Sequence, residues 1–199
     1  MKSEHPLPYL FLLIFTMCTP LIGRPLIGCT FLAGIRYDDM RMCIATPAGV
    51  KGGPIADIMA NIRLPVDDKS SVGVKIPVMR PILFGAAFRM LQFEPEITLG
   101  YQPAGNVGKH LFIESGVGGS FHYGPDYTTE RDATAREDFF AAGPIISSLF
   151  AFRLPGPVAK RRYLGLKLFY AALFAKERPR GTVFGTAIET GFAIFQPQP

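Results

Sequence analysis

An alternation of apolar and polar residues runs through residues 91–102, LQFEPEITLGYQ. Successive side chains of a β-strand point to opposite faces, so one face of this segment is aliphatic and aromatic, while the other carries Glu94 and Glu96. The pattern predicts a strand that is apolar on one side and acidic on the other. It also raises the question of which surroundings accept both faces.

The same period-two pattern recurs along most of the chain. Turn-forming residues such as Asp67-Asp68-Lys69-Ser70 separate the alternating segments. The content of 21 glycines and 18 prolines agrees with many strands and turns. We therefore expect an all-β fold with eight strands near 26–37, 55–66, 72–78, 91–102, 109–123, 143–154, 163–174 and 184–194.

The composition of the two faces distinguishes a membrane barrel from a soluble one. Soluble β-sandwiches also alternate, but a soluble barrel points its large aliphatic residues inward and its charges outward. Here one face is almost continuously apolar, and the other mixes glycines with isolated charges. In a chain that closes into a barrel, this pattern predicts that the apolar face meets lipid and the polar face lines a narrow lumen.

The lengths of the expected connections agree with this prediction. Outer-membrane barrels have short periplasmic turns and longer external loops. With the N-terminus in the periplasm, the first, third, fifth and seventh connections are external. Long and short connections alternate until the last in the series 38–54, 67–70, 80–89, 103–107, 124–138, 155–160 and 176–181.

The N-terminal residues 1–23 have the pattern of a secretory signal peptide. Lys2 precedes the apolar run 7–23, which Arg24 ends. Cleavage near Gly23 would leave residues 24–199 as the barrel domain. An uncleaved anchor is the alternative interpretation.

Cys29 follows Leu26-Ile27-Gly28, which has the form of a lipobox. A lipobox directly adjoins the apolar core of its signal, whereas Arg24 and Pro25 intervene here. We therefore favour a small apolar strand residue over an acylated N-terminal cysteine.

Charge and hydropathy argue against two other classes of protein. The formal net charge is +5, and the basic residues are dispersed except at 160–162 and 176–180. No basic stripe interleaved with stacking aromatics is evident, so a nucleic-acid partner is not expected. Beyond the N-terminus there is no apolar run of about 18 residues, which argues against a helical membrane bundle.

Residues 26–195 resemble the small eight-stranded outer-membrane proteins, the OmpW, OmpX and OmpA-barrel families. Segment 107–124, VGKHLFIESGVGGSFHYG, is similar to OmpW-like strands. The final stretch 186–195, TAIETGFAIF, is similar to the signal read by the barrel assembly machinery, although residues 196–199 follow its terminal aromatic. The resemblance implies an antiparallel up-and-down transmembrane barrel in the bacterial outer membrane. It implies outer-membrane lipid and the assembly machinery as partners, and no cofactor.

The polar face carries charges of both signs. An unpaired buried charge is costly, so a narrow lumen requires these charges to neutralise one another. Arg36 is a further basic residue of the lumen if the alternation in residues 26–37 points its side chain inward, which is the phase that we prefer. The expected lumen charge network consists of Arg63, Lys75, Arg153 and Lys167 with Asp57, Glu94, Glu96, Glu114 and Glu189.

One strand also carries the parts of an acyl-transfer site. Ser120 and His122 share a face at a Cα spacing of about 6–7 Å, but Glu114 lies about 20 Å along the strand, so a neighbouring strand would have to supply the acid. We favour an interior histidine with satisfied hydrogen bonds and assign no catalytic residue. His110, His122 and Glu114 are spread along one strand, so we assign no metal site.

Three functional hypotheses follow. The first is a non-enzymatic barrel whose external loops, 38–54 and 124–138, contact a ligand or host surface, with a narrow passage for small hydrophobic molecules as implied by the OmpW-like resemblance. The basic residues Lys176, Arg178 and Arg180 would meet lipid phosphates at the surface, or form a solvated loop. The alternatives are a lipid A-modifying acyl hydrolase and an exported soluble barrel that binds lipid.

Overall fold

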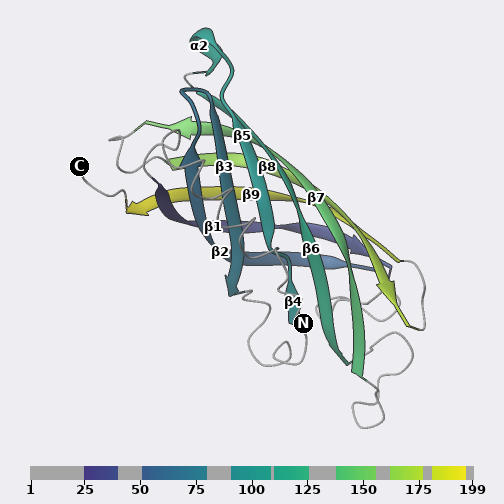
Figure 1. Ribbon diagram of the computed structural model, residues 1–199. Helices are drawn as coiled ribbons and strands as arrows, with labels where there is room; N and C mark the ends of the chain where they lie inside the picture. The colour runs from purple at the N-terminus through teal and green to yellow at the C-terminus, as the bar shows by residue number, and fades with distance from the viewer. Residues whose placement is uncertain are drawn as a thin grey trace, which may run out of the picture.

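The computed structural model describes residues 25–39, 51–79, 91–108, 110–125, 138–155, 162–176 and 181–195. Nearly all of them lie in strands, which Figure 1 shows wrapped side by side into a tilted barrel. One short helix, α2 (Gly105–Gly108), lies in a connection. The strands are β1 (Leu26–Asp38), β2 (Gly53–Pro65), β3 (Ser70–Met79), β4 (Leu91–Phe93), β5 (Glu96–Tyr101), β6 (Leu111–Pro125), β7 (Asp138–Leu154), β8 (Arg162–Ala175) and β9 (Gly181–Phe195).

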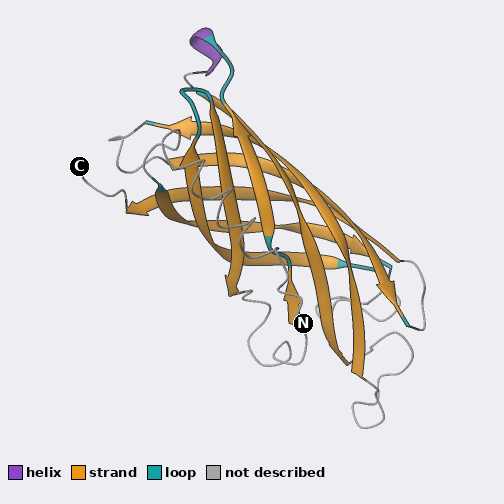
Figure 2. Ribbon diagram, in the orientation of Figure 1, coloured by secondary structure: helices purple, strands orange, loops and turns teal. Residues whose placement is uncertain are grey.

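All the strands belong to one antiparallel sheet that closes on itself (Figure 2). The sheet order is β4-β6-β5-β3-β2-β1-β9-β8-β7, and an additional pairing of β6 with β7 completes the circle. The first strand pairs with the last, since Thr30 lies opposite Gly191 and Arg36 opposite Gly185. Closure pairs the first strand of the barrel with the last, as a membrane-spanning sheet requires, and among the described strands β4 pairs with β6 alone.

Strands β4 and β5 are one barrel strand interrupted at Pro95. Phe93 pairs with Phe121 and Glu96 pairs with Gly118, so both pieces follow β6 in the same register with no residue inserted. Pro95 has no N–H for the ladder, although its carbonyl oxygen accepts from the Gly119 N–H at 3.3 Å. The barrel is therefore eight-stranded, and the single strand expected at 91–102 is confirmed.

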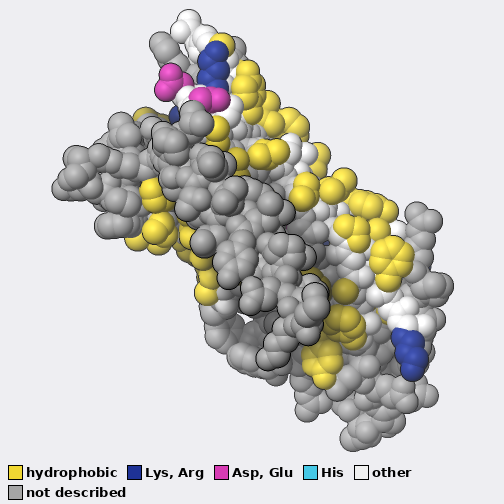
Figure 3. All heavy atoms as spheres, viewed as in Figure 1, with side chains coloured by type: hydrophobic (Ala, Val, Ile, Leu, Met, Phe, Trp, Pro, Cys, Tyr) yellow, Lys and Arg dark blue, Asp and Glu magenta, His cyan; other side chains and the backbone are white. Residues whose placement is uncertain are grey.

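The outward face is an apolar belt, and the expected orientation of the strands is confirmed. Leu164, Leu166 and Leu168 are 47, 44 and 44% exposed, whereas Lys167 between them is buried. Apolar side chains run along the described part of the surface in Figure 3. The soluble alternative required these leucines to line an internal cavity, and that interpretation is wrong. Within the described residues, no helix is long and apolar enough to cross a membrane.

The lumen is a packed core in which polar and apolar layers alternate. Phe112, Leu149, Ala151 and Tyr163 form one buried apolar cluster. A second cluster contains Leu32, Ile55, Ala141, Ile145, Phe169, Ala171, Leu173, Val183 and Ala187. Side chains thus fill the space, as expected for an eight-stranded barrel.

Several element boundaries differ from the sequence prediction. Strand β7 begins at Asp138 rather than near residue 143, because Phe140 outside and Ala141 inside continue its alternation. The connection between β5 and β6, residues 102–110, is longer than expected because it contains α2. Asp38, expected in the first loop, is the last residue of β1.

The barrel has two ends, which we name by their connections. The turn end carries the connections 66–69, 102–110 and 155–161, and the loop end carries 39–52, 80–90, 126–137 and 176–180. The segment 1–23, expected to be a signal peptide, most of both expected contact loops, and residues 196–199 lie outside the described residues.

Candidate functional site: the charged lumen

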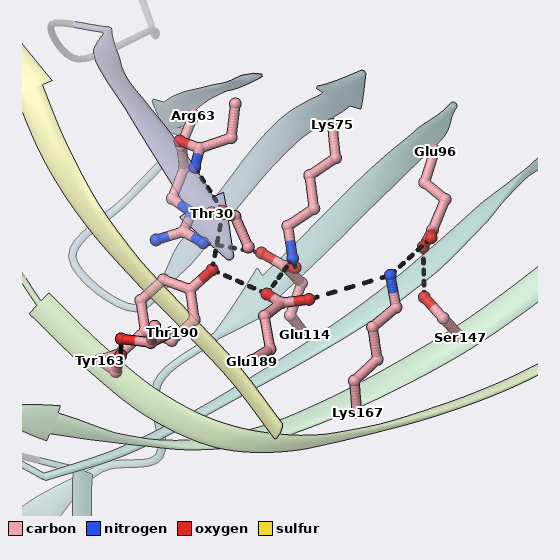
Figure 4. A network of polar contacts seen from close by, with 11 residues as sticks. Thr30, Arg63, Lys75, Glu96, Glu114, Ser147, Tyr163, Lys167, Glu189 and Thr190 are labelled. Atoms are coloured by element: carbon pink, nitrogen blue, oxygen red, sulfur yellow. Dashed lines mark hydrogen bonds and ion pairs between the residues drawn. The ribbon is translucent and has the colours of Figure 1, made fainter. Parts of the chain in front are cut away.

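The centre of the lumen holds an ion-pair network built around Lys75 of β3. Its Nζ lies 2.5 Å from Glu114 Oε1 of β6 and 2.6 Å from Glu189 Oε1 of β9. Figure 4 shows these side chains pointing toward one another from different strands. The side chains of Lys75, Glu114 and Glu189 are 2, 3 and 0% exposed, so the pairs are almost fully removed from solvent.

A second branch of the network joins β5 and β8. Lys167 Nζ lies 2.5 Å from Glu96 Oε1 and 3.9 Å from Glu189 Oε2. The hydroxyl of Ser147 on β7 donates to Glu96. Glu189 therefore connects the Lys75 and Lys167 branches. The acidic face of residues 91–102 is accepted inside the barrel because Glu96 pairs there with Lys167.

A third branch is formed by Arg63 of β2. Its guanidinium donates to Glu114 Oε2 at 2.8 Å, and its Cζ lies 4.5 Å from the ring centroid of Phe112 and 5.7 Å from that of Tyr163. The Tyr163 hydroxyl donates to Glu189 Oε1 at 2.8 Å. Arg63 is thus held by a carboxylate and two aromatic faces together.

These three branches balance charge across the barrel. Three cations, Arg63, Lys75 and Lys167, face three carboxylates, Glu96, Glu114 and Glu189. Removing charges from water is costly, and close pairing with further hydrogen bonds offsets this cost. The network therefore links six strands across the lumen by side-chain contacts.

A second polar cluster lies toward the loop end. Arg36 donates to Gln92 Oε1 at 2.6 Å and pairs with Asp38 at 3.0 Å. Ser120 donates to Glu94 Oε1 at 2.8 Å and lies 3.1 Å from His122 Nε2. We call these six residues, from β1, β4, β6 and the Glu94 linker, the loop-end cluster.

The loop-end cluster does not have the arrangement of a catalytic triad. In a triad the serine and the acid contact different ring nitrogens of the histidine. Here Glu94 Oε1, at 3.3 Å, and Ser120 both contact His122 Nε2, while Nδ1 lies 3.9 Å from Asp38 Oδ2. Ser120 and His122 are 0% exposed, so a substrate cannot reach the hydroxyl in this conformation.

The remaining residues expected in the lumen network are placed elsewhere. Asp57 is buried on β2, and Arg153 lies near the turn end with its Cζ 5.9 Å from the Phe112 ring centroid. Glu94 belongs to the loop-end cluster. Arg36 points inward, which confirms the preferred phase of β1.

Of the residues singled out outside the lumen, His110 and Lys176 are exposed beside strand ends. Arg178 and Arg180 lie outside the described residues. Cys29 is a free thiol on β1, opposite Ala60 of β2 and Phe192 of β9. The described part of the chain contains no group of three or more His, Cys, Asp or Glu side chains placed to hold a metal ion.

Four hydrogen-bonding residues were missed as members of the network. They are Thr30, Asn61, Ser147 and Tyr163, and the Asn61 amide donates to Thr30 Oγ1 at 2.6 Å. The alternation already placed Asn61, Ser147 and Tyr163 on the inward face. The missing information was which strands bring them level with the charges.

No protein-family model matches the chain, and no curated protein matches it. Among solved structures, the Ail attachment invasion locus protein of Yersinia pestis, in complex with the heparin analogue sucrose octasulfate, matches with a TM-score of 0.54 and 8% identity. The match covers 85% of this chain and 97% of Ail. Neisserial surface protein A matches with a TM-score of 0.54 and 6% identity, covering 87% of this chain and 99% of that protein. The chain therefore has the fold of the small eight-stranded outer-membrane β-barrel proteins.

Proposed function

We propose that this barrel spans a bacterial outer membrane and acts without enzymatic activity, holding external loops for contact with a ligand or a host surface. The observation that carries the proposal is the closed lumen. The pairs Lys75–Glu189 and Lys167–Glu96 join strands that are not neighbours in the wall, so the barrel interior serves as a support rather than as a site for substrates. The connections at the loop end are then the parts left for recognition.

Polyanionic carbohydrate is the ligand class that we propose for the loop end. Lys51 and Lys176 are exposed there, and the sequence places Arg178 and Arg180 in the last loop. Sulfated sugars present many anionic oxygens, which lysine and arginine side chains bind well. The solved complex of Ail with a heparin analogue is a precedent for such a ligand on this fold.

The test is binding of whole bacteria that display the full chain to immobilised heparin and to cultured epithelial cells. We expect binding above that of bacteria lacking the chain, and a decrease for the triple variant Lys176→Gln, Arg178→Gln and Arg180→Gln. Lys69→Gln, a charge change at the turn end, is the matched control and should bind as the unmodified chain does. Equal adhesion with and without the chain would overturn the proposal.

Passage of small hydrophobic molecules is the less supported role. A molecule crossing the centre of the lumen would have to separate Lys75 from Glu189 and displace the apolar cluster of Phe112, Leu149, Ala151 and Tyr163. Breaking a buried ion pair costs about 3–5 kcal/mol, and an apolar molecule offers the charges no replacement partner. The closed lumen therefore favours the loop-based role.

A further inference from the structure

A shallow cavity of about 60 Å³ opens at the turn end of the barrel, away from the loops assigned above. It lies between the turn 66–69, the ends of several strands and the aromatic layer of the lumen. Its walls carry guanidinium, ammonium, hydroxyl and amide groups. The residues that matter for recognition are Arg63, Arg153, Arg162, Lys69, Ser70, Ser71 and Gln102.

The charge of this cavity is positive. Arg63, Arg153, Arg162 and Lys69 line it, against the carboxylates of Asp67 and Asp68. Asp67 Oδ1 already accepts from the backbone N–H groups of Lys69 at 2.7 Å and Ser70 at 2.6 Å. Both acids keep their negative charge and Glu114 neutralises Arg63, so the other charged residues, Arg153, Arg162 and Lys69 against Asp67 and Asp68, leave one net positive charge at the cavity.

Two of the four cationic groups, those of Arg63 and Arg153, are held in place before any ligand arrives. Arg63 is fixed by Glu114 and by the faces of Phe112 and Tyr163, and Arg153 lies over the same Phe112 ring. The Gln102 N–H donates to the Lys69 carbonyl oxygen at 2.7 Å, which ties the turn to the next connection. Preorganised donors lose little conformational entropy when they bind.

We propose that this cavity is a binding site for a phosphate group presented from the periplasmic side. Its guanidinium groups come from β2, β7 and β8, and its hydroxyl groups come from β3. Donors that converge from several directions suit the tetrahedral oxygens of phosphate better than a planar carboxylate, and arginine forks pair with phosphate in bidentate fashion. A soluble phosphate ester and a phospholipid headgroup of the inner leaflet are the two possible sources.

The test is a titration of the full chain, refolded in octyl glucoside, with inorganic phosphate at constant ionic strength. Amide NMR signals of Ser70, Ser71 and Gln102 should shift and saturate. The double variant Arg153→Gln and Arg162→Gln, which leaves Arg63 and the central network intact, should weaken binding by about tenfold or more. The matched control His110→Gln, at an exposed turn-end residue outside the cavity lining, should bind phosphate as the unmodified chain does.

Nanodiscs of different lipids distinguish a phospholipid headgroup from soluble phosphate as the ligand. Nanodiscs of phosphatidylglycerol without free phosphate should shift the same amides if the headgroup occupies the cavity, while nanodiscs of a phosphate-free glycolipid should not. Either phosphate source supports the site. Shifts that rise linearly without saturation, or that are equal in the double variant, would overturn it, and neither result bears on adhesion by the loops.

Discussion

Lys75 and Glu189 are 114 positions apart in the chain, yet their Nζ and Oε1 atoms lie 2.6 Å apart at the centre of the lumen. The contact joins β3 to β9 across the inside of the barrel, where no backbone pairing connects these strands. Backbone hydrogen bonds close the barrel wall, and side-chain contacts across the lumen stabilise the same closed form.

Replacing Lys75 by methionine should destabilise the barrel. The change leaves Glu114 and Glu189 without their shared cation, and breaking a buried pair costs about 3–5 kcal/mol. Unfolding by urea, followed by the gel mobility of unboiled samples, measures the loss without relying on tryptophan, which the chain lacks. Adding Glu189→Gln should recover part of the stability, and no recovery would argue against direct coupling.

The unmodified barrel should not conduct ions. The network and the apolar clusters fill the lumen, so a planar bilayer containing the purified chain should show no steady current. Lys75→Ala combined with Lys167→Ala removes both central ammonium groups and should give measurable conductance. Val78→Ala, a change on the outward face, serves as control, and a current from the unmodified chain would contradict the closed lumen.

The Ser120 hydroxyl should be structural rather than nucleophilic. Ser120→Ala removes a hydrogen bond to buried Glu94, and we expect a loss of about 1–3 kcal/mol in the free energy of unfolding. His122→Ala should fold and be similarly weakened. Incubation of the purified chain with lipid A, followed by analysis of released fatty acids, should show no release. Acyl release that either substitution abolishes would restore the hydrolase hypothesis.

Leu166→Arg should be costly because this side chain faces lipid. It is flanked across the sheet by Phe150 and Ile188, which are also exposed on the outward face. Arginine near the midplane of a membrane barrel costs about 2–4 kcal/mol. The measurement is the free energy of unfolding in lipid vesicles. The control Asp68→Arg, in the exposed turn, should leave this free energy nearly unchanged. Equal stability of the two variants would contradict the belt.

The β2–β3 turn should weaken in acid. Backbone N–H groups of Lys69 and Ser70 hold the pKa of Asp67 below its usual range. A lowered pKa in the folded chain means that the ionised carboxylate stabilises the turn above the ordinary Asp pKa, and this contribution is lost as the pH falls through the folded pKa. Carboxyl NMR titration should give a lower midpoint for Asp67 than a model peptide does. In the Asp67→Ala variant, the NMR chemical shift of the Ser70 amide should no longer depend on pH in this range.

The alternation of the sequence predicted which residues face inward, because the two faces of a strand meet such different surroundings. It did not predict which inward residues touch. Glu94 and Glu96 share a face but are about 7 Å apart along the strand, so Glu96 meets Lys167 while Glu94 meets Ser120. Arg63 and Arg153 both belong to the inward face and both reach the Phe112 ring, but the alternation did not predict that Arg63 pairs with Glu114.

Partner choice depends on strand register and tilt, which bring residues from distant strands to the same height. Tyr163 and Glu189 illustrate this dependence, since the register places Gly165 opposite Glu189 and Gly191 opposite Tyr163. The tyrosine ring then occupies space that a side chain at Gly191 would fill. Such a fit is a property of two strands together, so neither segment alone reveals it.

Placing Glu189 on the last strand has a consequence for biogenesis. Until β9 has inserted beside β1, Lys75 and Tyr163 lack the carboxylate that both contact in the finished barrel. A chain cut short before residue 181 would thus carry uncompensated positive charge inside an open sheet, a state unfavourable in lipid. Insertion of β9 therefore closes the sheet and supplies the carboxylate that Lys75 and Tyr163 contact in the same step.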